Sequence, residues 1–74
     1  MLRFLVESLI KELIKDTKSS NLYDILKHAV FTANDNFTCG EMCTAENRLH
    51  DAILKHHDVD ETMHILEEYG VLEP

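Results

Sequence analysis

The side chains of this sequence best suited to bind a transition metal or to react as nucleophiles are two thiols and five imidazoles. Cys39 and Cys43 lie four residues apart on a predicted helix, so both project from one helical face. His50 shares that face, but it lies about 10 Å along the helix axis from Cys43. Zinc ligands lie about 2.0–2.3 Å from the ion, so a complete site would need ligands from another helix or chain. We therefore predict no metal site and no cofactor, and Cys39 and Cys43 are the candidate ligands if a metal binds.

The same two cysteines suggest an alternative function, a metal- or redox-responsive switch. Cys39 falls in the first turn of a predicted helix, where the helix N-terminus can lower the pKa of a thiol. Asp35 and Glu41 oppose this effect, because nearby carboxylates disfavour the thiolate. A disulfide between residues four apart would restrain a single helical turn. Two cysteines in 74 residues are also too few for a disulfide scaffold, so we expect reduced thiols in a cytoplasmic protein.

The residue patterns that support catalysis do not occur in this sequence. No Ser, His and Asp can be assigned together as nucleophile, base and orienting group, and no glycine-rich phosphate loop is present. Four short helices also leave little room for a substrate pocket of about 300 Å³ or more. We therefore predict that the protein is not an enzyme.

The charges of the chain, −7 in total, are distributed unevenly along it. Residues 1–28 hold five cations and four acids, whereas residues 29–74 hold two cations and ten acids. A surface that binds phosphates needs clustered cations, so direct binding to nucleic acid is not expected. A helix-turn-helix regulator and an acidic mimic of nucleic acid are kept as further alternatives. The recognition helix of such a regulator would offer Arg48 and Lys55 as its cations.

The spacing of apolar residues predicts an all-α fold, a compact bundle of about four short helices in one domain spanning residues 1–74. The expected helices cover residues 2–15, 21–33, 39–57 and 59–69. Thr38 and Glu41 fit a capping box at the third helix, and Asp58 fits the N-cap of the fourth. Gly70 suits the left-handed position after the last helix. The charges within residues 2–14 argue against a signal peptide and a membrane span.

Each predicted helix has an apolar face that we expect to be buried in the core. The faces of the second and third helices comprise Leu22, Ile25, Leu26, Ala29, Val30 and Ala33, and Met42, Ala45, Leu49, Ala52, Ile53 and His56, respectively. The face of the first helix spans an arc of about 180°, whereas an ordinary surface helix has a stripe of about 100°. Phe4 lies outside even this wide arc. Such a helix is either central to the bundle or shared between two chains.

These observations predict a small acidic protein-interaction module, a regulator or inhibitor that binds the surface of a partner protein. Small acidic helical proteins without catalytic groups are common among phage antagonists of host machinery, and this analogy is one of class alone. We expect a homodimer or larger homo-oligomer, a protein partner with a basic surface, and no binding to membranes. The candidate partner-binding residues are Phe4, Leu5, Ile10, Ile14, Asp58, Asp60, Glu61, Glu67, Glu68 and Glu73.

Overall fold

The protein folds as a small bundle of helices, seen here in a computed structural model that describes residues 3–16 and 20–73. Its helices are α1 (Arg3–Lys15), α2 (Ser20–Ala33), α3 (Cys39–His50), the short π-helix η1 (Asp51–Lys55) and α4 (Val59–Glu68). The predicted all-α bundle of about four short helices is therefore confirmed. Residue 2, the predicted start of the first helix, lies outside the described residues.

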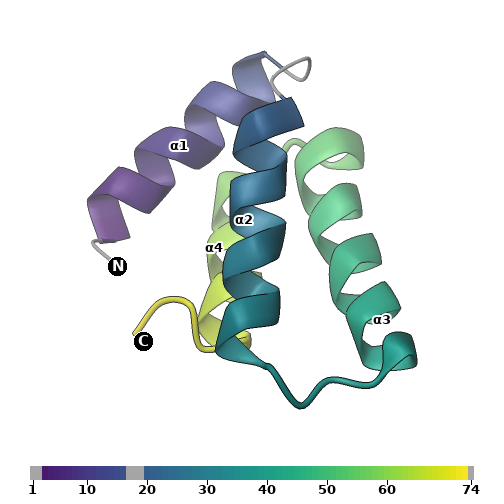
Figure 1. Ribbon diagram of the computed structural model, residues 1–74. Coiled ribbons are helices and arrows are strands. Elements are labelled where there is room, and N and C mark those ends of the chain that lie inside the picture. Colours follow the sequence, from purple (N-terminus) through teal and green to yellow (C-terminus); the bar gives the residue numbers. More distant parts are fainter. Residues whose placement is uncertain (1–2, 17–19, 74) are drawn as a thin grey trace.

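The helices are arranged so that α2 stands between α1 and α3, with α4 behind α2 (Figure 1). Toward its N-terminus, α1 leans away from α2, and its contacts there are with α4. The chain after α4 returns to the start of α1, where Arg3 Nη1 donates a hydrogen bond to the main-chain oxygen of Glu73 at 3.4 Å. The first turn of α1 is thereby held next to the end of the chain.

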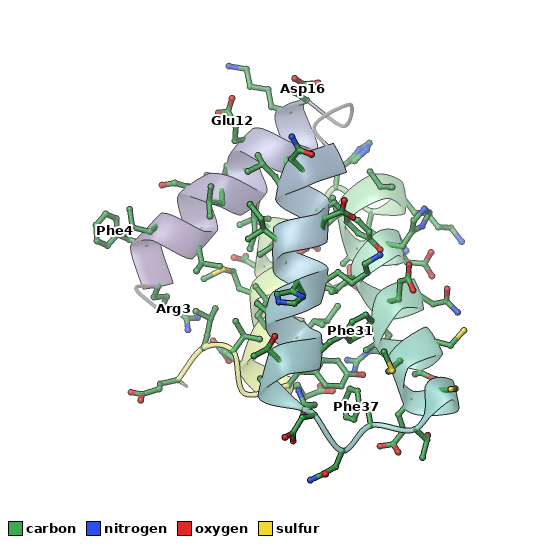
Figure 2. The ribbon with its side chains drawn as sticks, viewed as in Figure 1. Arg3, Phe4, Glu12, Asp16, Phe31 and Phe37 are labelled. Carbon is green, nitrogen blue, oxygen red and sulfur yellow. The ribbon has the colours of Figure 1, made fainter. Side chains whose placement is uncertain are left out.

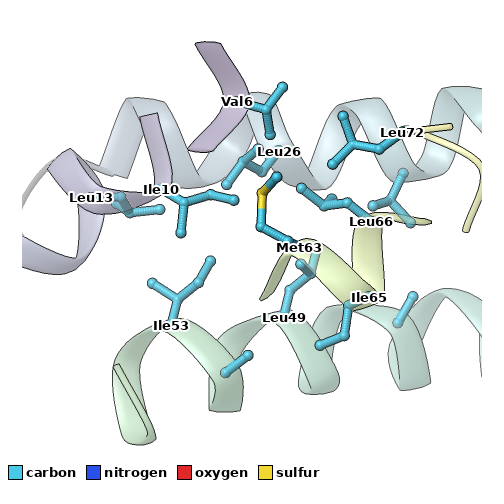
Figure 3. Close-up of a cluster of buried hydrophobic side chains, with 13 residues drawn as sticks. Val6, Ile10, Leu13, Leu26, Leu49, Ile53, Met63, Ile65, Leu66 and Leu72 are labelled. Atoms are coloured by element: carbon cyan, nitrogen blue, oxygen red, sulfur yellow. The ribbon is translucent and has the colours of Figure 1, made fainter. Parts of the chain in front are cut away.

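One apolar core joins all the helices (Figure 3). Val6, Ile10 and Leu13 enter the core from α1, Leu26 enters it from α2, and Leu66 enters it from α4. Burial of side chains of this size stabilises the fold by about 1.5–3 kcal/mol each. The buried apolar residues are Val6, Ile10, Leu13, Leu26, Val30, Ala45, Leu49, Ala52, Ile53, Met63, Ile65, Leu66 and Leu72.

The helix ends follow the capping signals of the sequence. Thr38 caps α3: its hydroxyl accepts from the main-chain N–H of Glu41 at 3.2 Å, and the Glu41 carboxylate accepts from the main-chain N–H of Thr38 at 3.3 Å. Asp58 caps α4 through its carboxylate, which accepts from the main-chain N–H of Glu61 at 3.0 Å. Gly70 has a φ of 78°, and its N–H donates to the main-chain oxygen of Glu67 at 3.1 Å, while the N–H of Val71 donates to that of Leu66 at 2.9 Å. These predictions are confirmed.

The end of the third helix differs from the prediction of a single helix over residues 39–57. The α-helix stops at His50, and the next five residues wind as the wider π-helix η1. His56 closes this wider turn, because its N–H donates to the main-chain oxygen of Asp51 at 2.8 Å. His57 then reverses the chain with a φ of 50°, a conformation that glycine adopts more readily than histidine. Nothing in the sequence of η1 signals this change of pitch.

Several residues predicted to be buried are exposed. Residues 39–44, in the first turns of α3, are all exposed, and Met42 is among them. Ile25 is 52% exposed, because the core meets α2 along Leu26 and Val30 and the apolar face of α2 is wider than this contact. His56 is also exposed and pairs with a carboxylate of α4.

Candidate partner-binding surfaces

The first turns of α1 carry two large apolar side chains outside the core. Phe4 is 64% exposed and Leu5 is 49% exposed, and Phe4 points away from the bundle (Figure 2). Arg3 forms an ion pair with Glu67 of α4, so this end of α1 is tied to the rest of the fold. Phe4 and Leu5 are therefore presented from an anchored helix. We call these two residues the α1 tip.

Carboxylates lie close to the α1 tip. Glu67 is part of the ion pair with Arg3, and Glu73 is placed next to Arg3 by its main-chain hydrogen bond. Glu7 lies one turn further along α1, where its carboxylate is 3.7 Å from the Lys11 ammonium group. Ion pairs this exposed contribute at most about 1 kcal/mol to stability. Two of these three acids are paired with cations, so the surroundings of the α1 tip have an excess of one negative charge.

Two other candidate partner-binding residues of α1 are buried or partly buried in the fold. Ile10 is fully buried, so it belongs to the core and is not accessible to a partner. Ile14 is partly buried and packs against the same core. The wide apolar arc of α1 is therefore divided between core residues and the exposed Leu5, because only one side of the helix meets the bundle.

Most of the acidic candidates in the last third of the chain have partners within the fold. Asp58 caps α4, and Glu61 lies 2.8 Å from His56 Nδ1. Asp60 and Glu73 are exposed, and no side-chain partner faces their carboxylates in the described ranges. The remaining two, Glu67 and Glu68, pair with the arginines Arg3 and Arg48. The acidic segment is thus used largely to join α4 to the rest of the bundle.

Arg48 is the centre of the best-defined polar cluster on the surface. Its guanidinium group donates to both carboxylate oxygens of Glu68 and, at 3.2 Å, to the hydroxyl of Tyr69. These hydrogen bonds lower the pKa of Glu68 and raise the pKa of Arg48. The ring of Tyr69 also packs edge-on against Phe37. Sequence reasoning missed this cluster, because no local pattern relates α3 to residues about twenty positions later.

The outward side of α2 is the second surface with exposed apolar groups. Ile25 and His28 separate two shallow hollows. One hollow, of about 550 Å³, lies toward Lys27 and Phe31. The other, of about 470 Å³, is lined by small side chains of α2 and by the chain after α4, namely Ala29, Thr32, Ala33, Gly70 and Val71. Sequence reasoning assigned Ile25 to the core and so did not identify this surface.

A third hollow, of about 480 Å³, lies between the start of α3 and the end of α4. Phe37 and Tyr69 line it on the apolar side, and Glu41 lines it on the polar side. The Glu41 carboxylate is already engaged in the capping box of α3. This hollow therefore presents two aromatic edges and no free cation.

The two thiols are accessible but do not form part of a ligand cluster. Cys39 and Cys43 are both exposed on the first turns of α3. The amide group of Asn47 lies 3.7 Å from the Sγ atom of Cys43. Across residues 3–16 and 20–73, no group of three or more His, Cys, Asp or Glu side chains is placed to hold a metal ion. A metal bound at Cys39 and Cys43 would need ligands from a second molecule.

The comparisons with known proteins add no further information about these surfaces. Neither a protein family, nor a curated protein, nor a solved structure matches this chain. Among the described residues, no helix is long and apolar enough to cross a membrane. The candidate surfaces must therefore be interpreted from their own chemistry.

Proposed function

We propose that this protein is a non-enzymatic interaction module, a small acidic regulator or inhibitor that binds the surface of a partner protein. The observation that supports this proposal most directly is the exposure of Phe4 and Leu5 on the tethered end of α1. Aromatic and aliphatic side chains that enter a pocket dominate the energetics of many interfaces. Presentation from a fixed helix lowers the entropy cost of binding. The α1 tip is therefore the proposed contact.

The partner that fits the α1 tip has an apolar pocket with a basic rim. Phe4 and Leu5 would enter the pocket, and the carboxylates of Glu7 and Glu73 would lie close to the rim. Charges at the edge of an interface mainly accelerate association and are screened by salt. We therefore expect binding that weakens as salt rises but keeps an apolar component.

The test is affinity capture from a lysate of the cells that make the protein, with wild type and two variants as bait. Phe4→Ser combined with Leu5→Ser removes the α1 tip, whereas Met42→Ser removes an exposed apolar side chain of α3. We expect a partner retained by the wild type and by Met42→Ser and reduced at least about tenfold by the double variant, a loss of about 1.4 kcal/mol. Equal retention by the double variant, with helicity unchanged in circular dichroism, would refute the proposal.

The alternative, a metal- or redox-responsive switch, depends on the exposed pair Cys39 and Cys43. Metal analysis of protein purified without chelators separates it from the interaction module. Stoichiometric zinc that is lost in a Cys39→Ser, Cys43→Ser variant would favour the switch. Metal-free protein whose helicity and partner capture are unaffected by both substitutions would favour the module.

A further inference from the structure

The outward side of α2 combines a projecting apolar side chain with hollows next to it. We call Ile25, His28, Ala29, Thr32 and Ala33 the α2 face. Ile25 projects from this face and, with His28, lines one end of the hollow of about 470 Å³, which continues along the helix over Ala29, Thr32 and Ala33. The projecting side chain and the hollow therefore lie next to each other along the same helix.

We propose that the α2 face binds a second copy of this chain, with the two α2 helices antiparallel about a two-fold axis between His28 and Ala29. Ile25 and Thr32 are equally distant from such an axis, about 5 Å each along the helix. Ile25 of each copy then stands opposite Thr32 of the other and fills its hollow. The small side chains of Ala29 and Ala33 let the two helices approach closely.

Self-complementarity is the reason to assign this face to a second copy. In a two-fold contact the same patch serves both molecules, so each projection and each hollow is used twice. Any other partner would need its own projection and hollow at the matching spacing. The α2 face supplies both from one sequence.

The α2 face is also a surface on which two copies of this acidic chain can meet without bringing acids together. Each chain has a net charge of −7, so two copies repel one another over most orientations. The α2 face contains no carboxylate, ammonium or guanidinium group. Asp24 lies at its edge, and the two-fold axis sets it opposite Ala33 of the second copy and not opposite another acid. The contact therefore brings uncharged surfaces together, and added salt should strengthen it by screening the repulsion between copies.

Light scattering and sedimentation, from micromolar to millimolar concentration, measure this association directly. We expect the wild type to approach the mass of two 8.6 kDa chains and Ile25→Glu to remain at the mass of one, because the variant buries a carboxylate against the second copy. Phe4→Glu is the matched control, since it adds the same charge at another exposed apolar position and should leave the dimer intact. A wild type that stays monomeric throughout, or a dimer dissociated by Phe4→Glu and not by Ile25→Glu, would overturn the proposal.

Disulfide trapping tests the register of the contact in a background with Cys39→Ser and Cys43→Ser. Chains with Ile25→Cys mixed with chains with Thr32→Cys should form linked pairs on oxidation. Each variant alone should link at least about tenfold less, because the two copies of residue 25 lie about 10 Å apart along the helices. Equal linking by Ile25→Cys alone would overturn the antiparallel arrangement. Loss of the α1 tip should leave this dimer intact, so failure of either proposal is distinguishable from failure of the other.

Discussion

Asn34 stands where α2 and α4 both end, and its amide group serves both helices. Its Nδ2 atom donates to the main-chain oxygen of Val30 at 2.9 Å and to that of Tyr69 at 2.7 Å. The first bond satisfies a carbonyl at the end of α2, which lacks a partner within the helix. The second joins two segments that are 35 residues apart in the sequence. One side chain therefore fixes the relative position of two helix ends.

Replacing Asn34 with Ala should lower the free energy of unfolding by about 1–3 kcal/mol, because two partly buried carbonyl groups lose their donor. The measurement is urea denaturation followed by circular dichroism. Asn36→Ala is the control, since Asn36 is exposed in the same turn and should change stability by less than about 0.5 kcal/mol. Equal effects of the two substitutions would show that the Asn34 hydrogen bonds contribute nothing to stability.

His57 has a backbone conformation that residues with a Cβ atom disfavour. Its φ of 50° lies in the left-handed region, and its side chain is exposed. Replacement by Gly removes the clash between Cβ and the backbone at a smaller cost in chain entropy, so we expect a gain of about 0.5–1 kcal/mol. Gly70→Ala, at the other left-handed position, should do the opposite and lose about 1 kcal/mol. Thermal unfolding of both variants checks the pair, and a destabilised His57→Gly variant would contradict the argument.

At the scale of helices, the features that the sequence predicts most reliably are those that depend on residues close together in the chain. Caps such as Thr38 with Glu41 depend on groups three positions apart, so the start of α3 is predictable. The exposure of Ile25 depends on where the core meets α2, and neither this exposure nor the π-helix η1 has a signal in the local sequence. Phe4 was placed outside the apolar arc and named as a partner-binding candidate, and it is exposed, whereas the α2 face was not predicted at all.

Helix α1 offers an internal comparison between core and surface. Leu13 is 1% exposed and Leu5 is 49% exposed on the same helix. Leu13→Ala should therefore cost about 2–5 kcal/mol, because it removes buried methyl groups and leaves a cavity. Leu5→Ala should cost less than about 0.5 kcal/mol. Denaturant midpoints of the two variants give the comparison, and a large loss from Leu5→Ala would place that residue in a contact that the monomer does not show.

At the scale of the whole molecule, the fold brings the two arginines of the chain to its acidic C-terminal third. Arg3 from the first turn and Arg48 from α3 both reach carboxylates of α4. The uneven charge seen along the sequence is thus partly balanced in space. This balance was not predictable, because it depends on α1 and α3 both packing beside α4. The consequence is that acid should loosen the contacts of α4.

The pH dependence of stability tests this pairing through Glu68. Hydrogen bonds from Arg48 lower the pKa of Glu68 in the folded state, so the folded chain binds this proton less readily than the unfolded chain does. The resulting stabilisation is fully present above the ordinary carboxylate pKa of about 4.3 and is lost as the pH falls through the lower folded-state value. Glu68→Gln should therefore be less stable than the wild type at pH 7, and the difference should shrink on acidification toward pH 2. Denaturation series at several pH values measure this convergence, with Asp60→Asn as the control at an exposed carboxylate of the same helix. A constant difference between Glu68→Gln and wild type across this range would mean that the charge of Glu68 does not contribute to holding α3 against α4.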